Sequence, residues 1–352
     1  MLYQTANPHG GDTYSHPAAL DFSANLNPLG TPDGVRRAAE ASLSGLNRYP
    51  DPYCRELVRA IAQFEGVKET AVLCGGGAAE LIYSYCAAIR PKRALELSPT
   101  FCEYATALKA AGCEVERWPL KKERDFSLEE SFCTYLCQGG WDAVFLCNPN
   151  NPTGQLIEPA LLGQIAEICR DKKIRLFVDE CFLDFTDVWK EQSLKPLLAG
   201  HPELFILKAF TKSYGMAGLR LGYGLCGDRE LLGAMSRLVQ PWNVSVPAQA
   251  AGVAALKETA FLQRTRRLVQ QQRLWLEEKL APFAIEVYPS SANYLLLYSR
   301  VPLWERLMEQ GIIVRNCANY PGLGEGWVRI AVKGPKENQR LVAALQKIEG
   351  AV

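Results

Sequence analysis

A lysine and an arginine lie eight positions apart, separated mostly by small residues, in the segment 210–223 (FTKSYGMAGLRLGY). Lys212 follows the apolar run 204–207, which predicts a short buried strand. A lysine at such a place can form a Schiff base with a carbonyl compound, while Thr211 and Arg220 can bind a phosphate beside it. Most single lysines are solvated surface charges, so this chemistry needs support from the rest of the chain.

Two further polar residues follow predicted strands. Asp179 ends the apolar run 174–178, and an acid there can pair with a cofactor's pyridinium nitrogen and make the ring an electron sink. The alternative is an ordinary carboxylate at a strand end. Asn151 lies in the turn 147–154 (CNPNNPTG) after the strand-like run 143–147. Its side chain can donate to a ring hydroxyl, although many such turns have only a backbone role.

A glycine-rich turn in the segment 73–82 (LCGGGAAELI) joins a predicted strand to a predicted helix. Its free backbone N–H groups form an anion site at the helix N-terminus, although glycines also occur in such turns for steric reasons. An imine-forming lysine, an acid for a ring nitrogen and two groups of phosphate ligands are together what pyridoxal 5′-phosphate requires.

The order of these motifs resembles the fold-type I pyridoxal-phosphate enzymes, and within them the aspartate aminotransferase superfamily. The resemblance runs from about Asp21 to Val332. It implies an α/β fold with a mostly parallel, seven-stranded-type sheet sandwiched by helices and a smaller α+β C-terminal domain. It also implies that Lys212 is the Schiff-base lysine and that Asp179 is the partner of the pyridinium nitrogen.

The same resemblance implies which residues bind the cofactor. They are Ala78 and Ala79 (backbone donors to the phosphate), Phe101 (stacked on the ring), Asn151 (near the 3-hydroxyl), and Thr211 and Arg220 (phosphate). Tyr49 matches a tyrosine that reaches the phosphate in the neighbouring subunit, which implies a homodimer. Phe182 departs from the family, which usually has a tyrosine there, so a hydrogen bond to the 3-hydroxyl is expected to be absent.

Two arginines near the C-terminus match substrate ligands of the family. Arg329 matches the arginine that binds the substrate carboxylate, and a structural salt bridge is its alternative role. Arg315 matches an arginine that binds a substrate phosphate in histidinol-phosphate aminotransferases. The resemblance therefore implies a small phosphorylated amino acid as substrate.

The segments 9–12, 20–30 and 314–326 resemble the L-threonine-O-3-phosphate decarboxylases, a branch of lyases that make (R)-1-amino-2-propanol O-2-phosphate for cobalamin assembly. The resemblance then adds His9 and Asn25, on the N-terminal arm, to the substrate ligands; a loose surface histidine is the alternative for His9. Histidinol-phosphate aminotransferase remains the competing function, because the two reactions differ by a rotation about one substrate bond. A regulator with a DNA-binding module is disfavoured, since the chain begins directly with the arm.

Composition narrows the partners and the compartment. The chain has 352 residues, with 39 basic and 38 acidic side chains, which favours neither nucleic acid nor a membrane as partner. We find no signal sequence and no apolar run of membrane-spanning length, and twelve cysteines are typical of reduced thiols in the cytoplasm. Cys133 and Cys137 are the closest cysteine pair, but no second pair or histidine completes a zinc site, and the chain has only three histidines, so we predict that no metal is bound.

The chain is predicted to have three parts. Residues 1–35 read as an extended arm, 36–245 as the large PLP-binding domain and 246–352 as a small C-terminal domain. Within the last part, we expect a long helical segment over 248–280, followed by strands at 293–297, 312–314 and 328–332.

Overall fold

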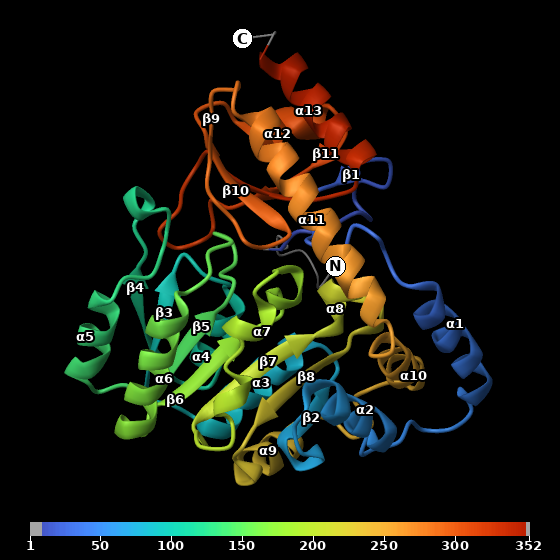
Figure 1. The fold of residues 1–352 in the computed structure, drawn as a ribbon, viewed down its shortest axis with the longest axis vertical. Coiled ribbons are helices and arrows are strands. Elements are labelled where there is room, and N and C mark those ends of the chain that lie inside the picture. The colour runs from blue at the N-terminus through green and yellow to red at the C-terminus, as the bar shows by residue number, and fades with distance from the viewer. Residues whose placement is uncertain (1–8, 350–352) are drawn as a thin grey trace.

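A computed structural model describes residues 9–349 and contains a seven-stranded sheet below a smaller antiparallel one (Figure 1). The large sheet has the strand order β2-β8-β7-β6-β5-β3-β4. Strand β8 runs antiparallel to both of its neighbours, and the other six strands all run in one direction. The strands are β2 (Val72–Gly75), β3 (Arg93–Ser98), β4 (Glu114–Pro119), β5 (Ala143–Cys147), β6 (Arg175–Asp179), β7 (Leu204–Ala209) and β8 (Gly222–Cys226).

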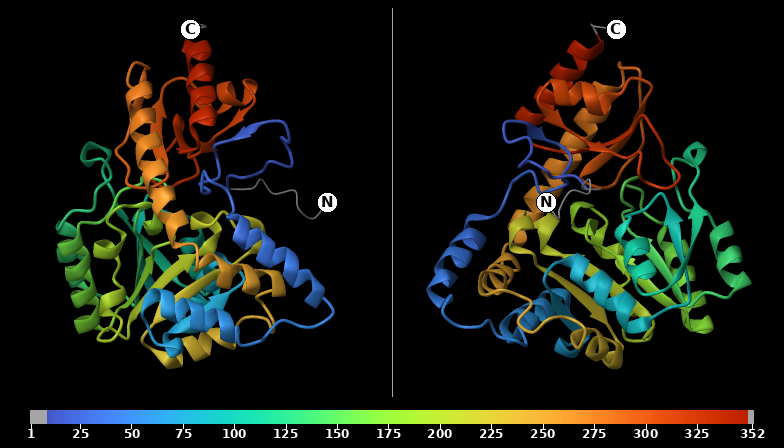
Figure 2. Two further views of the ribbon diagram at one scale, coloured as in Figure 1. Left: turned by 45° about the vertical axis from the view of Figure 1, so that its right-hand side comes forward. Right: turned by 180° about the vertical axis from the view of Figure 1, so that it is seen from behind.

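Helices cover both faces of this sheet (Figure 2). The central strands β5, β7 and β8 are buried along their whole length, which is typical of a parallel sheet between two helical layers. One apolar cluster packs the first face under α2 (Arg55–Glu65), α5 (Ser131–Gln138), α6 (Pro159–Lys172) and α10 (Val246–Ala255). Another packs the opposite face under α3 (Ala78–Ile89), α4 (Glu103–Ala110) and α9 (Arg229–Ser236).

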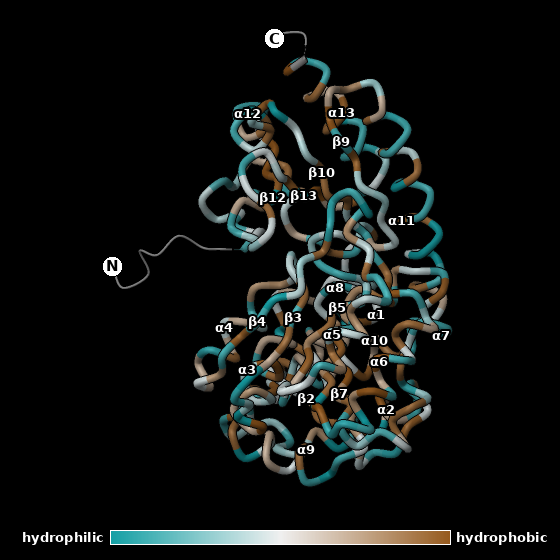
Figure 3. Tube along the Cα trace, turned by 90° about the vertical axis from the view of Figure 1, so that its left-hand side faces the viewer, coloured by the Kyte–Doolittle hydropathy of each residue, from teal (hydrophilic) through white to brown (hydrophobic). Residues whose placement is uncertain are grey.

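The smaller sheet has the order β12-β13-β10-β9 and its own apolar cluster. Its strands are β9 (Ile285–Val287), β10 (Tyr294–Ser299), β12 (Arg315–Asn316) and β13 (Trp327–Ala331). It is packed by α11 (Thr259–Leu280), α12 (Leu303–Glu309) and α13 (Pro335–Glu349). Figure 3 shows hydrophobic residues within both sheets and many hydrophilic residues along α11.

The N-terminal arm is attached to the C-terminal part of the chain. The short strand β1 (Leu20–Asp21) pairs in parallel with β11 (Ile312–Ile313), and Figure 1 labels the two strands next to each other. Helix α1 (Asp33–Ser42) begins directly after Pro32, whose fixed φ is compatible with a helix start. The pairing carries the arm toward the space between the two sheets.

The remaining regular segments are short and lie in the connections. They are α7 (Trp189–Gln192) and α8 (Phe210–Ser213), with the 3-10 helices η1 (Leu43–Gly45), η2 (Glu69–Ala71), η3 (Lys122–Arg124), η4 (Leu183–Phe185), η5 (Lys195–Leu197) and η6 (Ala217–Leu219). Within residues 9–349, no helix combines the length and the apolar character needed to cross a bilayer.

The predicted fold class is confirmed, and the predicted strands are present with ends shifted by up to two residues. One helix prediction was wrong: 248–280 is two helices, because the backbone leaves the helical region at Glu258. The break allows α10 to pack on α1 while α11 packs on α13. The division of the chain at 35/36 and 245/246 stays a prediction.

Candidate active site

A cavity of about 330 Å³ opens at the carboxyl ends of the parallel strands. Cys147, Asp179 and Ala209, the last residues of β5, β6 and β7, all line it. Crevices at this edge of a parallel sheet are the usual ligand sites of α/β proteins. The cavity brings together every predicted site residue except Tyr49: His9, Asn25, Ala78, Ala79, Phe101, Asn151, Asp179, Thr211, Lys212, Arg220, Arg315 and Arg329.

Lys212 lies on α8, directly after β7, and its side chain is partly open to this cavity. Its Nζ is 5.9 Å from the centroid of the Phe182 ring. Surrounding protein atoms, followed by the positive charge of Arg329, lower the pKa of Lys212 to about 8. A larger fraction of this amine than of an ordinary lysine is therefore neutral, and hence nucleophilic, near neutral pH.

Asp179 is buried at the end of β6 and accepts two hydrogen bonds. The hydroxyl of Tyr104 donates to its Oδ2 at 2.6 Å, and the backbone N–H of Cys181 donates to its Oδ1 at 2.9 Å. Burial raises the pKa of Asp179, while these hydrogen bonds lower it. A cation at the carboxylate would favour its ionised form further.

Tyr104 was missed by the sequence reasoning. It lies in the first turn of α4, three residues after Phe101, and the two rings are 5.5 Å apart in an edge-to-face arrangement. Its short spacing from Phe101, which lies just before α4, was a signal that the two rings are neighbours, but nothing local indicated the contact with Asp179.

The N-terminus of α3 and Arg220 also line the cavity. A Cβ on Gly77 would lie 2.7 Å from Nη2 of Arg220, and one on Gly222 would lie 2.8 Å from the backbone nitrogen of Ala78. Gly77 has φ of +103°, which also favours glycine. A cation beside the positive end of a helix is unfavourable unless an anion lies with them. These residues therefore fit the phosphate of pyridoxal 5′-phosphate.

Arg329 reaches from β13 into the cavity and contacts two other segments, the N-terminal arm and the turn that contains Asn151. Its Nη2 donates to the backbone oxygen of Ser23 at 2.9 Å, and its Nη1 donates to Oδ1 of Asn151. With the Asn25 amide oriented to satisfy its hydrogen bonds, its oxygen accepts from Nε and Nη1 of Arg329 at 3.1 and 3.2 Å. Among residues 9–349, no carboxylate forms an ion pair with Arg329, which disfavours the structural salt bridge.

Arg315 is 7% exposed and points into the same cavity from β12. Its Nη2 donates to Oδ1 of Asn319 at 2.8 Å, and its guanidinium carbon is 5.1 Å from the Tyr320 ring centroid. Tyr320 is a second residue to which the sequence reasoning gave no role. Its hydroxyl is 3.5 Å from Oδ1 of Asn151, so it borders both the arginine and the turn.

His9 lies at the rim of the cavity, where its Nε2 is 2.9 Å from Oε1 of Glu103 and its ring is 5.8 Å from Phe101. His9, Cys102 and Glu103 are also a group whose ligand atoms lie within 4.8 Å of one another. The absence of a bound metal stays a prediction.

Tyr49 lies away from this cavity. Its side chain is 76% exposed, and its ring stacks on that of Trp242 at a centroid distance of 4.2 Å. A role for Tyr49 in cofactor binding would therefore require the site of a second subunit, as the resemblance implied.

Comparison with known proteins places this geometry in a family. The sequence matches the family model described as aminotransferase class I and II over residues 17–345. It is 38% identical over 333 residues to threonine-phosphate decarboxylase of Salmonella typhimurium, covering 94% of this chain and 91% of that protein. It is 33% identical over 338 residues to histidinol-phosphate aminotransferase of Methanosarcina mazei, covering 93% of this chain and 87% of that protein.

Solved structures agree. Histidinol-phosphate aminotransferase from Clostridium acetobutylicum superposes with a TM-score of 0.89 at 28% identity, covering 95% of this chain and 100% of that one. L-threonine-O-3-phosphate decarboxylase from Porphyromonas gingivalis gives a TM-score of 0.83 at 25% identity, covering 94% and 99%. The chain therefore belongs to the aminotransferase class I and II family of pyridoxal-phosphate-dependent enzymes.

Proposed function

We propose that this enzyme decarboxylates L-threonine O-3-phosphate to (R)-1-amino-2-propanol O-2-phosphate in cobalamin biosynthesis. The observation that carries the proposal is the pair of arginines, Arg315 and Arg329, that line one cavity with Lys212. Two guanidinium groups suit a substrate with two anionic ends, a carboxylate and a phosphate. The 38% identity to a threonine-phosphate decarboxylase supports the same substrate.

Each proposed cofactor ligand in the cavity is assigned to one chemical group of the cofactor. When bound, pyridoxal 5′-phosphate supplies an aldehyde for the substrate amine and a ring that accepts the electrons of the broken Cα bond. Lys212 would hold the aldehyde carbon between turnovers. Its free amine, with a pKa of about 8 in the cofactor-free protein, could take up or release a proton near neutral pH when it is not bonded to the cofactor. Asp179 holds the ring nitrogen in its protonated form. The other proposed ligands are Ala78, Ala79, Thr211 and Arg220 for the phosphate, Phe101 for the ring face and Asn151 for the 3-hydroxyl.

The substrate ligands select the bond that breaks. Arg329 and Asn25 hold the carboxylate, while Arg315 and His9 hold the phosphate, so both ends of the substrate are fixed. The Cα bond that stands perpendicular to the cofactor ring would be the one that is cleaved. Fixing both ends of the substrate would limit rotation about its Cα–N bond, which decides which Cα bond stands perpendicular. A decarboxylase must orient the carboxylate without stabilising the charge that leaves.

The deciding experiment supplies L-threonine O-3-phosphate to the holoenzyme without any keto acid and follows CO₂ over many turnovers. Sustained release is expected. Histidinol-phosphate aminotransferase is the second candidate, favoured by the TM-score of 0.89. Absence of CO₂, with turnover of histidinol phosphate only when 2-oxoglutarate is present, would replace the decarboxylase by that aminotransferase.

The chain is further proposed to act as a homodimer in the cytoplasm. Exposed apolar side chains gather in the segment around Tyr49, including Leu46 at 64% and Tyr53 at 69% exposed, and such surfaces are typical of interfaces. All twelve cysteines are free thiols, as expected in a reducing compartment. Sedimentation of the holoenzyme tests the dimer, and a monomer at micromolar concentration would exclude it.

A further inference from the structure

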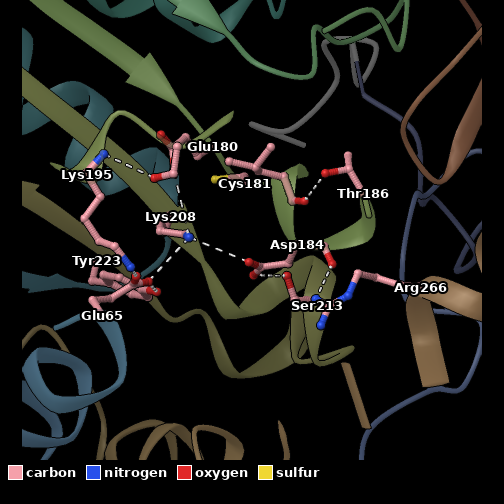
Figure 4. A network of polar contacts seen from close by, with 12 residues as sticks. Glu65, Glu180, Cys181, Asp184, Thr186, Lys195, Lys208, Ser213, Tyr223 and Arg266 are labelled. Atoms are coloured by element: carbon pink, nitrogen blue, oxygen red, sulfur yellow. Dashed lines mark hydrogen bonds and ion pairs between the residues drawn. The ribbon is translucent and has the colours of Figure 1, made fainter. Parts of the chain in front are cut away.

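A cluster of buried charges lies behind the cavity, around the ammonium group of Lys208 (Figure 4). Nζ of Lys208 is 3.4 Å from Glu65, 3.6 Å from Asp184 and 3.9 Å from Glu180, measured to the nearest carboxylate oxygen of each. Side chains alternate along a strand, and Ala209 of β7 faces the cavity, so Lys208 faces the opposite side. The cluster is therefore separate from the ligand site.

Two of these carboxylates are linked to the segments that carry the candidate catalytic residues. Glu180 directly follows Asp179 in the chain. Asp184 accepts a hydrogen bond at 2.9 Å from the hydroxyl of Ser213, which directly follows Lys212. One ammonium group thus contacts both carboxylates that hold the end of β6 and helix α8.

The same two segments are fixed from their other sides. Glu180 accepts hydrogen bonds from the Ser193 hydroxyl at 2.8 Å and from the backbone N–H of Leu194 at 3.0 Å. The side-chain amide of Asn27 donates to the backbone oxygen of Ser213 at 2.7 Å. The backbone N–H of Asn27 donates to the backbone oxygen of Lys212 at 3.1 Å. Ser213 is therefore held at both its hydroxyl and its carbonyl oxygen.

The third carboxylate anchors Lys208 to the body of the protein. Glu65, at the end of α2, also contacts Nζ of Lys195 at 2.9 Å and accepts a hydrogen bond from the hydroxyl of Tyr223. Burial raises the pKa of Glu65, but the two ammonium groups and this hydroxyl lower it to about 2. The pair of Glu65 and Lys208 is accordingly ionised throughout the neutral range.

We propose that Lys208 is a positioning residue, which fixes Lys212 relative to Asp179 by binding Asp184 and Glu180 at once. Removing one partner of a buried charge cluster leaves the others uncompensated, so the carboxylates would move or take up water. A displacement of about 1 Å at a reacting group can cost ~10²-fold in rate. The inference rests on the proposed roles of Lys212 and Asp179, and it does not depend on which amino acid the site accepts.

The experiment measures two properties of the bound cofactor: its dissociation constant and the pH midpoint of its lysine-linked absorbance. The variants are Lys208→Met, Lys208→Arg and Ser213→Ala, with Lys195→Met as the matched control. The control removes an ammonium group from the same cluster, but Lys195 contacts Glu65 and neither of the two linked carboxylates. Ser213→Ala breaks the link to Asp184 without any change of charge, which separates positioning from electrostatics.

We expect Lys208→Met and Ser213→Ala to move the midpoint in the same direction by about half a pH unit or more, equivalent to ~0.7 kcal/mol. We also expect both to raise the cofactor dissociation constant, while Lys208→Arg stays closer to the unmodified enzyme. Lys195→Met is expected to lower thermal stability without moving the midpoint.

An equal shift in Lys195→Met would show a general loss of stability and overturn the inference. So would an unmoved midpoint in Ser213→Ala, which remains decisive even if Lys208→Met does not fold. Peptide mapping after borohydride reduction separates this outcome from a failure of the proposed function. If the unmodified enzyme carries its cofactor on a residue other than Lys212, the assignment of the site fails and not only the role of Lys208.

Discussion

Two lysines four positions apart, Lys208 and Lys212, show how neighbours decide the behaviour of an enclosed amine. Loss of hydration lowers the pKa of both. Around Lys208, three carboxylates outweigh that effect, and its pKa lies above the usual value. Around Lys212, the charges of Arg329 and Arg220 add to it, and the pKa falls to about 8. The back of the sheet is rich in anions and holds a permanent cation, whereas the cavity is rich in cations and leaves its lysine reactive.

The largest effect is expected from replacing Lys212, the reactive one of the two lysines. Lys212→Ala should abolish turnover and the lysine-linked absorbance, because no other amine lines the cavity within residues 9–349. Absorbance spectra, borohydride reduction and peptide mapping check this result. A lysine-linked chromophore that persists in this variant would contradict the assignment of Lys212.

The next effect concerns the arginines of the cavity, which we propose to bind the negatively charged groups of the substrate and cofactor. Arg315→Ala should raise KM for a phosphorylated substrate, with a loss of about 2–5 kcal/mol typical of a buried charged contact. The effect on the same substrate without its phosphate should be small. Steady-state kinetics with both substrates measures the difference, and equal losses would remove the phosphate-binding role of Arg315.

Most residues that line the cavity could be predicted from the sequence, because they follow strands or lie at the starts of helices. Asp179, Asn151 and Lys212 come after apolar runs, and parallel strands bring their carboxyl ends to one edge. Motif order then identified the fold, and chemistry identified the cofactor. The turn residues and the two arginines were found for the same reason, since each is part of a local pattern.

The contacts that tune the site could not be predicted in this way. Tyr104 and Asp179 are 75 positions apart in the sequence, and Glu65 and Lys208 are 143 positions apart, so no local sequence pattern indicates that either pair is in contact. The break near Glu258 was also missed, because helix propensity continues through it and only packing on α1 and α13 requires two helices. Long-range packing decided these features.

A third prediction compares how Lys212 and Lys208 affect the free energy of unfolding of the cofactor-free protein. Lys212→Met should stabilise the fold near pH 7 by at most ~3 kcal/mol, because a pKa lowered from 10.5 to about 8 costs 1.36 kcal/mol per unit, reduced by water in the cavity. Lys208→Met should instead destabilise it by about 3–5 kcal/mol. Urea unfolding of the three proteins measures both free energies.

The pH dependence of these two effects has opposite signs. The unfolded chain binds more protons than the folded one at Lys212, so stability rises as pH increases from about 8 toward 10.5. The contribution of Lys208, whose pKa is raised by folding, is fully present below 10.5 and is lost at higher pH. Destabilisation by both variants at pH 7 would show that charge environment is not what distinguishes the two lysines.

The smallest expected effect concerns the hydroxyl that contacts Asp179. Tyr104→Phe removes a donor to the carboxylate, so the pKa of Asp179 should rise further and its pairing with a ring nitrogen should weaken. A hydrogen bond to a charged group is worth about 1.5–3 kcal/mol, but this one is present without the cofactor too, so cofactor affinity should fall by only part of that value, most at low pH. Tyr85→Phe is the matched control. Tyr85 lies in the same aromatic cluster, and its buried hydroxyl has no hydrogen-bond partner within residues 9–349. Equal cofactor affinities in the two variants would mean that the hydroxyl of Tyr104 only fills space. The pKa of Lys212 would then be set by the cations of the cavity, while the hydrogen bond from Tyr104 would have no effect on how Asp179 binds the cofactor.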